Sequence, residues 1–341
     1  MSTKSIQKSL NYQRFVIQKN LEYFKSNNIK NQKTFAEEIA LSLKDVPRSI
    51  SPKYFYDNLG SDLFDKICQL PEYYPYTCES SILKTITKNL ALHIPNDVRL
   101  VELGSGSSTK TRLLIDALFE LQDHVEYFPI DISDVLIDSV KELCSDYENL
   151  KVTGIIDTYE NGLDFIEHHD EKPNLITFLG SSFGNFSKED GDDFLARIHD
   201  LMKLSDYFLL GLDLKKDIDV LTNAYNDSNG LTAKFNLNIL ERINKELDAN
   251  FKISQFAHQA SYNESKGRIE MHLRSLSDQT VTIPKADISI QLAENELIHT
   301  ENSHKFTMSQ IDSMFEEVGL DIVQISFDTK KYFGLILAKK F

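Results

Sequence analysis

Two turns in the sequence combine glycine with polar side chains that could do chemistry. The first is ELGSGSST, residues 102–109, where an apolar strand gives way to a helix. Gly104 and Gly106 let the backbone approach a ligand closely, and the start of the following helix offers N–H groups without intrahelical partners. A dinucleotide fingerprint would have a further glycine where this chain has Thr109. The turn therefore argues against a pyrophosphate and favours a nucleoside without phosphates, chiefly S-adenosylmethionine. The alternative is a sharp structural turn.

Aspartates end the next two expected strands. Asp131 ends the strand that follows the first turn, and Asp157 ends the one after it. The carboxyl ends of adjacent parallel strands open onto the crevice where such sheets bind ligands. A carboxylate at Asp131 can accept hydrogen bonds from both ribose hydroxyls of a nucleoside, and Asp157 could meet the adenine end. Either aspartate alone is equally well explained as a helix N-cap.

The second glycine turn is GSSFGNF, residues 180–186, after the fourth expected strand. A turn at this place faces the ligand crevice of an open α/β sheet. Asn185 could merely cap the next helix, but Ser187 is an equally good cap. We therefore favour a functional role for Asn185.

These turns need a framework, and short apolar strands alternate with amphipathic helices from residue 98 onwards. The strands are expected at 98–103, 124–131, 151–156, 174–179 and 206–212, with helices at about 109–121, 133–147, 163–168 and 188–202. This alternation predicts right-handed crossovers and a mostly parallel sheet covered on both faces. Near the end, a helix at 309–318 precedes apolar strands at 321–327 and 332–339. Their tight turn predicts a hairpin, so the last strand must enter the sheet antiparallel to its neighbour.

The other segments follow different patterns. Residues 1–92 are expected to be helices and loops, with helices at about 35–41, 61–70 and 78–92 and an aromatic loop at 71–76. Thr34 and Glu37 form a candidate capping box for the first of these helices. Residues 214–250 are expected to be helical, and 256–304 to form antiparallel strands.

The composition describes a compact globular chain of 341 residues, 41% of them hydrophobic. The 37 basic and 52 acidic side chains give a net charge of −15, without a basic run, which argues against a nucleic-acid partner. No apolar stretch is long enough to span a membrane, and the N-terminus lacks the apolar core of a secretory signal. The 3 cysteines have neither disulfide nor metal-ligand spacing. We expect a cytoplasmic protein without a metal or a membrane partner.

The glycine turn, the two aspartates and the terminal hairpin together resemble class I S-adenosylmethionine-dependent methyltransferases. That resemblance implies a Rossmann-like, doubly wound seven-stranded sheet with an antiparallel last strand. Longer motifs narrow this resemblance to one family of methyltransferases. They are SPKYFYD (51–57), GSDLFD (60–65), LPEYYP (70–75), ELGSGSSTKTRLLIDAL (102–118), FLGSSFGNF (178–186), NAYNDSNGLTAKFNLNIL (223–240), RIEMHLRS (268–275) and HTENSHKF (299–306). In this order they resemble the histidine Nα-methyltransferases of ergothioneine biosynthesis, from about residue 50 to the C-terminus.

The resemblance implies trimethylation of the α-amino group of L-histidine to hercynine, and it implies roles for the substrate site. Tyr56 and Tyr225 would hold the substrate carboxylate. Tyr73 and Asn185 would contact the amino group as catalytic residues. The remaining substrate-binding residues would be Glu301 and Ser303, which hydrogen-bond the imidazole, together with Phe64 and Met271.

The resemblance also implies the residues that line the cofactor site. These are Gly104, Lys110, Asp131, Asp157, Thr158 and Gly180. Thr158 replaces the aromatic residue expected after Asp157. Lys110 stands at a helix start, where its charge opposes the helix dipole, which favours a ligand or an acidic partner for it.

Methyl transfer needs a neutral amine held in line with the methyl group, and it gains most from positioning. Tyr73 and the Asn185 carbonyl can accept amine hydrogens. Neither is an adequate general base at neutral pH, because a phenol titrates near pH ~10 and an amide does not titrate there. Water is the expected proton acceptor. Glu301 suits an imidazole N–H because an ionised carboxylate makes a strong hydrogen bond, so Glu301 and Ser303 would select histidine.

Other interpretations remain open at this stage. The tyrosines could be core residues, and Glu301 an exposed strand residue. The chain could methylate another aromatic amino acid such as a tryptophan derivative, or a protein, or bind S-adenosylmethionine without catalysis. We expect a monomer of two domains, a cofactor-binding core at 93–213 and 306–341 and an α+β substrate-binding domain at 1–92 and 214–305 that closes over the amino acid.

Overall fold

The computed structural model describes residues 11–27, 33–105, 109–132 and 136–341. Gly106 of the first glycine turn and the expected helix start at 133 lie outside them. The chain forms two compact units, and each is described by itself below. Unit 1 comprises Met1–Asn31, Cys78–Leu214 and Phe306–Phe341, and unit 2 comprises Gln32–Thr77 and Lys215–Lys305.

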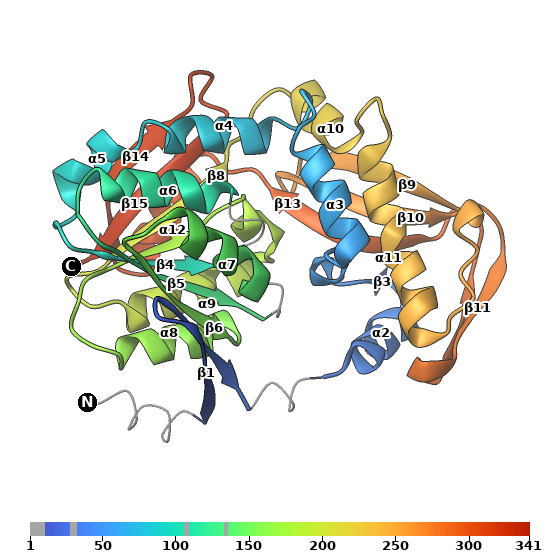
Figure 1. Cartoon of the computed structure of the whole chain (residues 1–341). Coiled ribbons are helices and arrows are strands. Elements are labelled where there is room, and N and C mark those ends of the chain that lie inside the picture. The colour runs from blue at the N-terminus through green and yellow to red at the C-terminus, as the bar shows by residue number, and fades with distance from the viewer. Residues whose placement is uncertain (1–10, 28–32, 106–108, 133–135) are drawn as a thin grey trace. The chain divides into compact units, whose positions relative to one another are not determined.

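Unit 1 is built on a sheet that has nine strands among the described residues, in the order β1-β2-β6-β5-β4-β7-β8-β15-β14 (Figure 1). The strands are β1 (Tyr12–Gln18), β2 (Leu21–Ser26), β4 (Arg99–Leu103), β5 (Val125–Asp131), β6 (Leu150–Ile156), β7 (Asn174–Phe178), β8 (Tyr207–Asp213), β14 (Leu320–Phe327) and β15 (Phe333–Lys340). β2 and β4 to β8 run parallel, and β15 pairs antiparallel with both β8 and β14. The expected α/β fold with an antiparallel last strand is confirmed.

The N-terminal hairpin is a difference from the sequence-based expectation, which gave only helices and loops there. β1 pairs antiparallel with β2, and β2 extends the parallel sheet beside β6. β1 is an edge strand, mostly exposed, so its alternation of polar and apolar residues is weak. The sheet therefore exceeds the seven strands that the resemblance implies.

Helices cover both faces of this sheet (Figure 1). One face carries α5 (Thr87–His93), α6 (Thr109–Phe119), α7 (Leu136–Asp146) and the end of α4 (Tyr74–Leu83), and the other carries α8 (Tyr159–Glu167), α9 (Lys188–Leu201) and α12 (Met308–Glu317). Their apolar residues form two buried clusters, one on each face. The single helix expected at 78–92 is two helices, and α4 takes in the end of the expected loop at 71–76.

Unit 2 contains a four-stranded sheet in the order β3-β13-β10-β9 within the part of the chain that is described. Its strands are β3 (Arg48–Ser49), β9 (Phe256–Asn263), β10 (Arg268–Ser275) and β13 (Leu297–His304), and a separate hairpin pairs β11 (Gln279–Ile283) with β12 (Ile288–Leu292). The helices are α2 (Phe35–Lys44), α3 (Asn58–Ile67), α10 (Ile218–Tyr225) and α11 (Leu231–Leu247). α11 packs against α3, β9 and β10 and forms the centre of this unit.

Local signals explain where helices of unit 2 begin. Thr34 caps α2, and Glu37 completes the capping box as expected. Asp57 caps α3 by accepting a hydrogen bond from Gly60 N at 2.7 Å, and it also accepts one from Asn238 of α11 at 2.8 Å. A Cβ at Gly60 would lie 1.7 Å from the Phe55 carbonyl oxygen, so this turn requires glycine.

The unit bounds differ from the expected domain bounds at the N-terminal side. The expected substrate domain contained all of residues 1–92, but β1 and β2 belong to the sheet of unit 1, and α2 and α3 belong to unit 2. α5 also lies in unit 1, where Leu90 packs in the core cluster of the sheet. Strand pairing over long sequence separations, which no local pattern reports, causes this difference.

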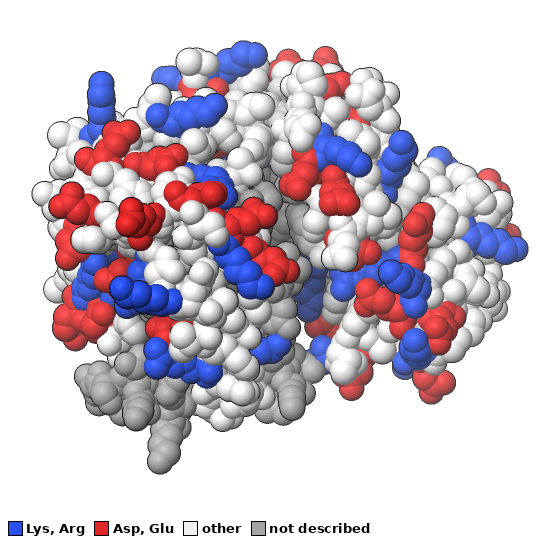
Figure 2. Space-filling view, viewed as in Figure 1, with Lys and Arg blue, Asp and Glu red and all other residues white. Residues whose placement is uncertain are grey.

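Charges on the viewed face are mixed. Figure 2 shows Lys and Arg interspersed with Asp and Glu on both units, and the described residues of this face form no continuous basic patch. None of the helices within the described ranges is both long and apolar enough to cross a membrane.

Candidate active site

A β-bulge in unit 2 decides which side chains of β13 share a face. Met271 of β10 pairs with Glu301, and the register shifts beyond this pair because Thr300 is an extra residue in β13. Since paired residues share a face, Glu301 lies on the face of Met271, and Ser303 follows it by alternation. The bulge also keeps the buried Ile298 on this face. The residues of β10 and β13 that the resemblance selects for the substrate site thus share one face.

Ser303 takes part in a buried polar cluster with a tyrosine and a lysine. The Tyr225 hydroxyl, at the end of α10, donates to Ser303 Oγ at 2.7 Å. Lys305 Nζ donates to Ser303 Oγ at 2.8 Å and to Tyr225 Oη at 3.1 Å. Lys305 is only 1% exposed. A buried ammonium is tolerated where hydrogen bonds compensate its lost hydration, and here it donates to two residues that the resemblance implies for substrate binding.

The other residues of unit 2 that the resemblance selects for the substrate site are in ring contact with one another. Ring centroids lie 5.6 Å apart for Tyr56 and Phe64, 6.0 Å for Phe64 and Tyr73, and 6.2 Å for Tyr73 and Tyr225. Phe235 of α11 lies 5.9 Å from Phe64 and 5.8 Å from Tyr56. Contacts of this kind fix ring orientation. The four aromatic residues that the sequence analysis selected here therefore form one cluster, with Phe235 as a further member.

The Tyr73 hydroxyl lies in an environment that disfavours the phenolate. Burial raises the pKa of Tyr73 well above its usual value, and the nearby Tyr225, Cys68, Tyr56 and Glu301 raise it further. Tyr73 is therefore a neutral hydroxyl at physiological pH. It can donate or accept a hydrogen bond, but it cannot serve as a general base.

The first glycine turn of unit 1 rests on a buried carboxylate. Gly104, at the end of β4, has φ +73°, and a Cβ there would lie 2.8 Å from Tyr159 Oη. Glu102 just before it accepts hydrogen bonds from Tyr127 at 2.5 Å and from Thr111 at 2.8 Å. Burial raises the pKa of Glu102 to about 7, although these hydrogen bonds act in the opposite direction. Through these hydrogen bonds the Glu102 carboxylate of β4 links this strand to β5 and α6 next to the turn.

A second buried carboxylate holds two of the selected cofactor residues. Glu79 of α4 is fully buried. It accepts hydrogen bonds from Gly180 N at 2.9 and 3.0 Å and from Lys110 Nζ at 2.7 Å. The acidic partner that the position of Lys110 predicted is therefore Glu79. This arrangement places an ammonium beside the turn that ends β7.

The ends of β5 and β6 carry the two aspartates. Asp131 is half-buried at the end of β5. Asp157 is 2% exposed and accepts hydrogen bonds from Tyr12 at 2.7 Å, Thr158 N at 2.8 Å and Asn161 at 3.0 Å. Thr158 caps α8. Asp157 thus has several protein donors, and the N-terminal hairpin supplies one of them.

Asn185 does not cap the helix that follows it. Ser187, not Asn185, caps α9 by accepting a hydrogen bond from Asp190 N at 3.1 Å. Asn185 ends the short helix Ser182–Asn185 and is half-buried. It belongs to unit 1, whereas the other selected substrate residues belong to unit 2.

Four residues that contact the selected ones were not singled out from the sequence. They are Tyr12 and Glu79 in unit 1, and Phe235 and Lys305 in unit 2. For two of them the sequence indicates a shared face, although not the partners that they contact. Lys305 continues the alternation of Glu301 and Ser303 onto one face, and Glu79 precedes the buried Ile82 and Leu83 by three and four residues, the spacing of one helix face.

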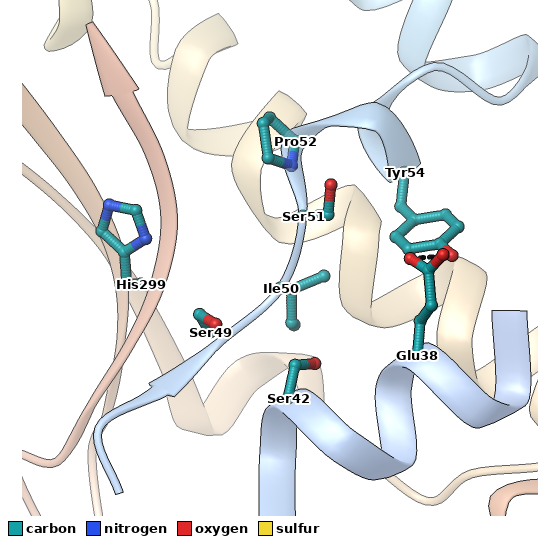
Figure 3. Close-up of a pocket in the computed structure, with 8 residues that line it drawn as sticks. All are labelled: Glu38, Ser42, Ser49, Ile50, Ser51, Pro52, Tyr54 and His299. Atoms are coloured by element: carbon teal, nitrogen blue, oxygen red, sulfur yellow. Dashed lines mark hydrogen bonds between the residues drawn. The ribbon is translucent and has the colours of Figure 1, made fainter. Parts of the chain in front are cut away.

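A separate cavity of about 230 Å³ lies elsewhere in unit 2 (Figure 3). Glu38 and Tyr54 line it and face one another, with Tyr54 donating at 2.7 Å, and His299 extends toward it from β13. His299 pairs with His272 on the face of the sheet opposite Glu301. Both rings are half-buried. None of the selected substrate residues lines this cavity.

Comparison with known families decides the identity of the chain. A family model described as histidine-specific methyltransferase, SAM-dependent, matches residues 35–340. The chain belongs to this family. The resemblance that the sequence motifs carry is thereby confirmed, as are an S-adenosylmethionine-dependent methyltransferase activity and the methyltransferase fold.

Individual relatives of this histidine-specific methyltransferase agree with the family. The histidine N-alpha-methyltransferase of Mycolicibacterium smegmatis is 37% identical, over 88% of this chain and 93% of that protein. Ergothioneine biosynthesis protein 1 of Neurospora crassa is 29% identical, over 82% of this chain and 32% of that protein. The L-tryptophan methyltransferase of Psilocybe serbica is 27% identical, over 80% of this chain and 83% of that protein.

The residues of unit 1 fit the cofactor that this methyltransferase family uses. Gly104 leaves open backbone where a side chain would meet Tyr159, and Asp131 offers carboxylate oxygens at the end of the adjacent strand. Lys110, held by Glu79, brings N–H donors beside the turn after β7. Such a donor set suits a nucleoside that carries an amino-acid tail.

Proposed function

We propose that this enzyme transfers methyl groups from S-adenosylmethionine to the α-amino group of L-histidine, three times in succession, and so forms hercynine in ergothioneine biosynthesis. Family membership supports the donor and the acceptor. The observation that carries the proposal is the face of β13, on which Glu301 and Ser303 lie next to Met271. This face offers a polar ring both a carboxylate and a hydroxyl.

Glu301 and Ser303 select the amino acid. An imidazole N–H donates to the Glu301 carboxylate, and the other ring nitrogen meets Ser303. An indole has one N–H and no ring acceptor, so a tryptophan derivative would leave one of these polar groups unsatisfied. The aromatic cluster of Tyr56, Phe64 and Tyr73 forms the wall beside the aliphatic part of the substrate. Tyr56 holds the substrate carboxylate, whereas the hydroxyl proton of Tyr225, the second residue that the resemblance implies for this role, is donated to Ser303.

Tyr73 and Asn185 position the amine. They accept the two hydrogens of the neutral amino group in the first transfer and its one remaining hydrogen in the second, and so aim its lone pair. The dimethylated amine of the third transfer has no hydrogen to donate and is held by the contacts of the substrate carboxylate and ring. In each transfer the N–CH3 bond forms as the S–CH3 bond breaks and S-adenosylhomocysteine leaves, and most of the rate enhancement comes from orientation. Because the pKa of Tyr73 is raised, its hydroxyl keeps its own proton. The amine proton leaves to water.

Unit 1 holds the cofactor in this proposal. S-Adenosylmethionine supplies an electrophilic methyl group on a sulfonium. Asp131 accepts hydrogen bonds from ribose hydroxyls, Gly104 gives the backbone room for close approach, and Lys110 contributes N–H donors. Asp157, Thr158 and the turn at Gly180 complete the site, and unit 2 supplies the amino-acid site.

The test is methyl transfer from labelled S-adenosylmethionine to a panel of free amino acids and one histidine-containing peptide. We expect turnover of L-histidine at least about 100-fold faster than of L-tryptophan or the peptide. Turnover of tryptophan or of the peptide without turnover of histidine would refute the substrate assignment. Binding of the cofactor without any turnover would identify a non-catalytic protein.

We further propose that the enzyme is a cytoplasmic monomer without nucleic-acid or membrane partners. A net charge of −15 opposes phosphate binding, and the 3 cysteines lack the spacing of a disulfide framework, which suits a reducing compartment. Light scattering after size-exclusion chromatography tests the monomer, and a mass of twice the chain would refute it.

A further inference from the structure

Lys305 has no part in the roles described above, although it is among the largest fully buried side chains of the described residues. It follows β13 directly, and its backbone N–H bonds Gly267 O at 2.8 Å, which fixes the chain at this point. The ammonium also lies 4.9 Å from the centre of the Tyr225 ring. A lysine so placed costs stability unless its charge is used.

The ammonium determines the direction of the hydrogen bonds around it, because it can only donate. Ser303 Oγ accepts from Lys305 at 2.8 Å and from Tyr225 at 2.7 Å. A hydroxyl has two acceptor lone pairs and one proton, so both acceptor positions of Ser303 are taken. Its proton is the group that remains to meet a ligand.

Glu301 lies on the same face and is an acceptor, whereas Ser303 is a donor. When ionised, its carboxylate can only accept hydrogen bonds. The pair therefore offers one acceptor and one donor to a ring that lies against β13. A neutral imidazole has one N–H and one nitrogen lone pair, and it satisfies both. An imidazolium has two N–H groups, one of which would face the Ser303 proton.

We propose that Lys305 is a positioning residue that turns Ser303 into an obligatory hydrogen-bond donor, so that the enzyme binds the side chain of its substrate as a neutral ring with an acceptor nitrogen toward Ser303. The charge of Lys305 acts in the same direction, since it repels a positively charged imidazolium bound to Ser303. This inference rests on the proposed function, because it takes histidine as the substrate.

The groups that face this cluster do not titrate between pH 5.5 and 8 in a way that imitates the effect. Tyr225 of α10 and Tyr262 of β9 are phenols, and burial raises the pKa of Tyr262. Two imidazoles lie close by, His258 and His304. His258 Nε2 lies 2.9 Å from the Tyr225 carbonyl oxygen, and burial lowers the pKa of His258. Burial, Arg268 and Lys305 lower the pKa of His304 to about 4, so it stays neutral over this range.

The test compares binding of two ligands to the full-length enzyme saturated with S-adenosylhomocysteine, by calorimetry from pH 5.5 to 8. L-Histidine has a ring that becomes protonated below about pH 6.5. The matched ligand is β-(1,2,4-triazol-3-yl)-L-alanine, whose ring stays neutral over this range. For the unmodified enzyme we expect the Kd of histidine to rise about tenfold per pH unit below the ring pKa, and the Kd of triazolylalanine to change by less than about twofold.

The Lys305→Met variant tests the role of the lysine itself. Its side chain has similar length but neither charge nor donor, so Ser303 can rotate and accept from an imidazolium that Glu301 also binds. We expect the rise in the Kd of histidine at pH 5.5 to shrink to less than about threefold. Lys252→Met, the same change at an exposed lysine of unit 2, should behave like the unmodified enzyme. A merely structural lysine would weaken both ligands equally at every pH.

The outcomes separate this inference from the proposed function. Absence of histidine binding and turnover at pH 8 in the unmodified enzyme would overturn the proposed function. Normal binding at pH 8 with a pH-independent Kd for histidine would overturn the neutral-ring inference alone. A tenfold rise that persists in Lys305→Met would show that the lysine does not set the polarity. Should that variant not fold, the comparison of the two ligands on the unmodified enzyme still decides whether the ring is bound neutral.

Discussion

Ile298 and Glu301 lie on the same face of the ladder between β10 and β13, although Glu301 comes three residues after Ile298. Thr300 forms a β-bulge between them. Regular alternation would place them on opposite faces. The bulge lets one strand contribute an apolar residue to the core and then a carboxylate to the proposed substrate site. A strand can thus carry a site next to the core that anchors it.

Replacement of Glu301 by alanine tests ring recognition. Glu301→Ala should raise the KM for L-histidine roughly 100-fold, because a charge-assisted hydrogen bond is lost, with cofactor affinity unchanged. Initial rates with histidine and tryptophan, and calorimetry with S-adenosylhomocysteine, measure these quantities. Glu264→Ala, at an exposed position, is the control. Unchanged discrimination between the two amino acids would refute the role of Glu301.

Replacement of Tyr73 by phenylalanine tests positioning of the amine. Tyr73→Phe keeps the ring in the aromatic cluster but removes the hydroxyl, so kcat should fall roughly 10- to 100-fold with a KM change below about threefold. Because burial raises the pKa of Tyr73, the rate of the unmodified enzyme should show no phenol titration up to pH 9. Initial rates of the two enzymes measured across the pH range give kcat, KM and any titration. A fall in rate of the unmodified enzyme that disappears in the variant would contradict this account.

Removal of the Glu79 carboxylate tests the support of the cofactor residues. Glu79→Ala leaves Lys110 and the N–H of Gly180 without this acceptor. The free energy of unfolding should drop by about 3–5 kcal/mol. At a temperature where the variant is folded, the Kd for S-adenosylhomocysteine should rise about tenfold. Denaturant unfolding and calorimetry measure the two effects. Glu120→Ala, on the exposed surface of unit 1, should change stability by less than about 0.5 kcal/mol.

The raised pKa of Glu102 gives stability a specific pH dependence. Its pKa is 4.5 in the unfolded chain and about 7 in the folded protein, so between these values the folded state binds more protons. The contribution of Glu102 is therefore fully present below about pH 4.5 and is lost as the pH rises through 7. In urea unfolding, the unmodified protein should lose on the order of 3 kcal/mol of its free energy of unfolding between pH 5 and pH 8 through Glu102. Glu102→Gln should not show this loss. The same pH dependence in both proteins would refute it.

Much of the framework could be predicted because its signals are local. The apolar strands of the sheet, the capping box of Thr34 and the cap by Ser187 each follow from residues within one turn or strand. The antiparallel entry of β15 follows from the tight turn that joins it to β14. The residues proposed for the substrate site of unit 2 come from long motifs, and their role stays a prediction. The structure shows that the rings of Tyr56, Phe64, Tyr73 and Tyr225 form one cluster.

The rest depends on partners far apart in the sequence. Tyr12 bonds Asp157, and Glu79 bonds Gly180, so neither role is visible in the residues around Tyr12 or Glu79. The hairpin of β1 and β2 escapes prediction because an exposed edge strand needs no continuous apolar face. Lys305 reads as a surface lysine, since lysine is rarely buried, until its contacts with Ser303 are seen.

The central claim is trimethylation of the α-nitrogen of L-histidine, and analysis of the product tests it most directly. The enzyme is incubated with L-histidine and excess methyl-labelled S-adenosylmethionine, and the product is examined by mass spectrometry and NMR. The account predicts a product that carries three labelled methyl groups, all on the α-nitrogen, with the imidazole unmodified. Methyl groups on a ring nitrogen, or accumulation of a monomethyl product only, would contradict it.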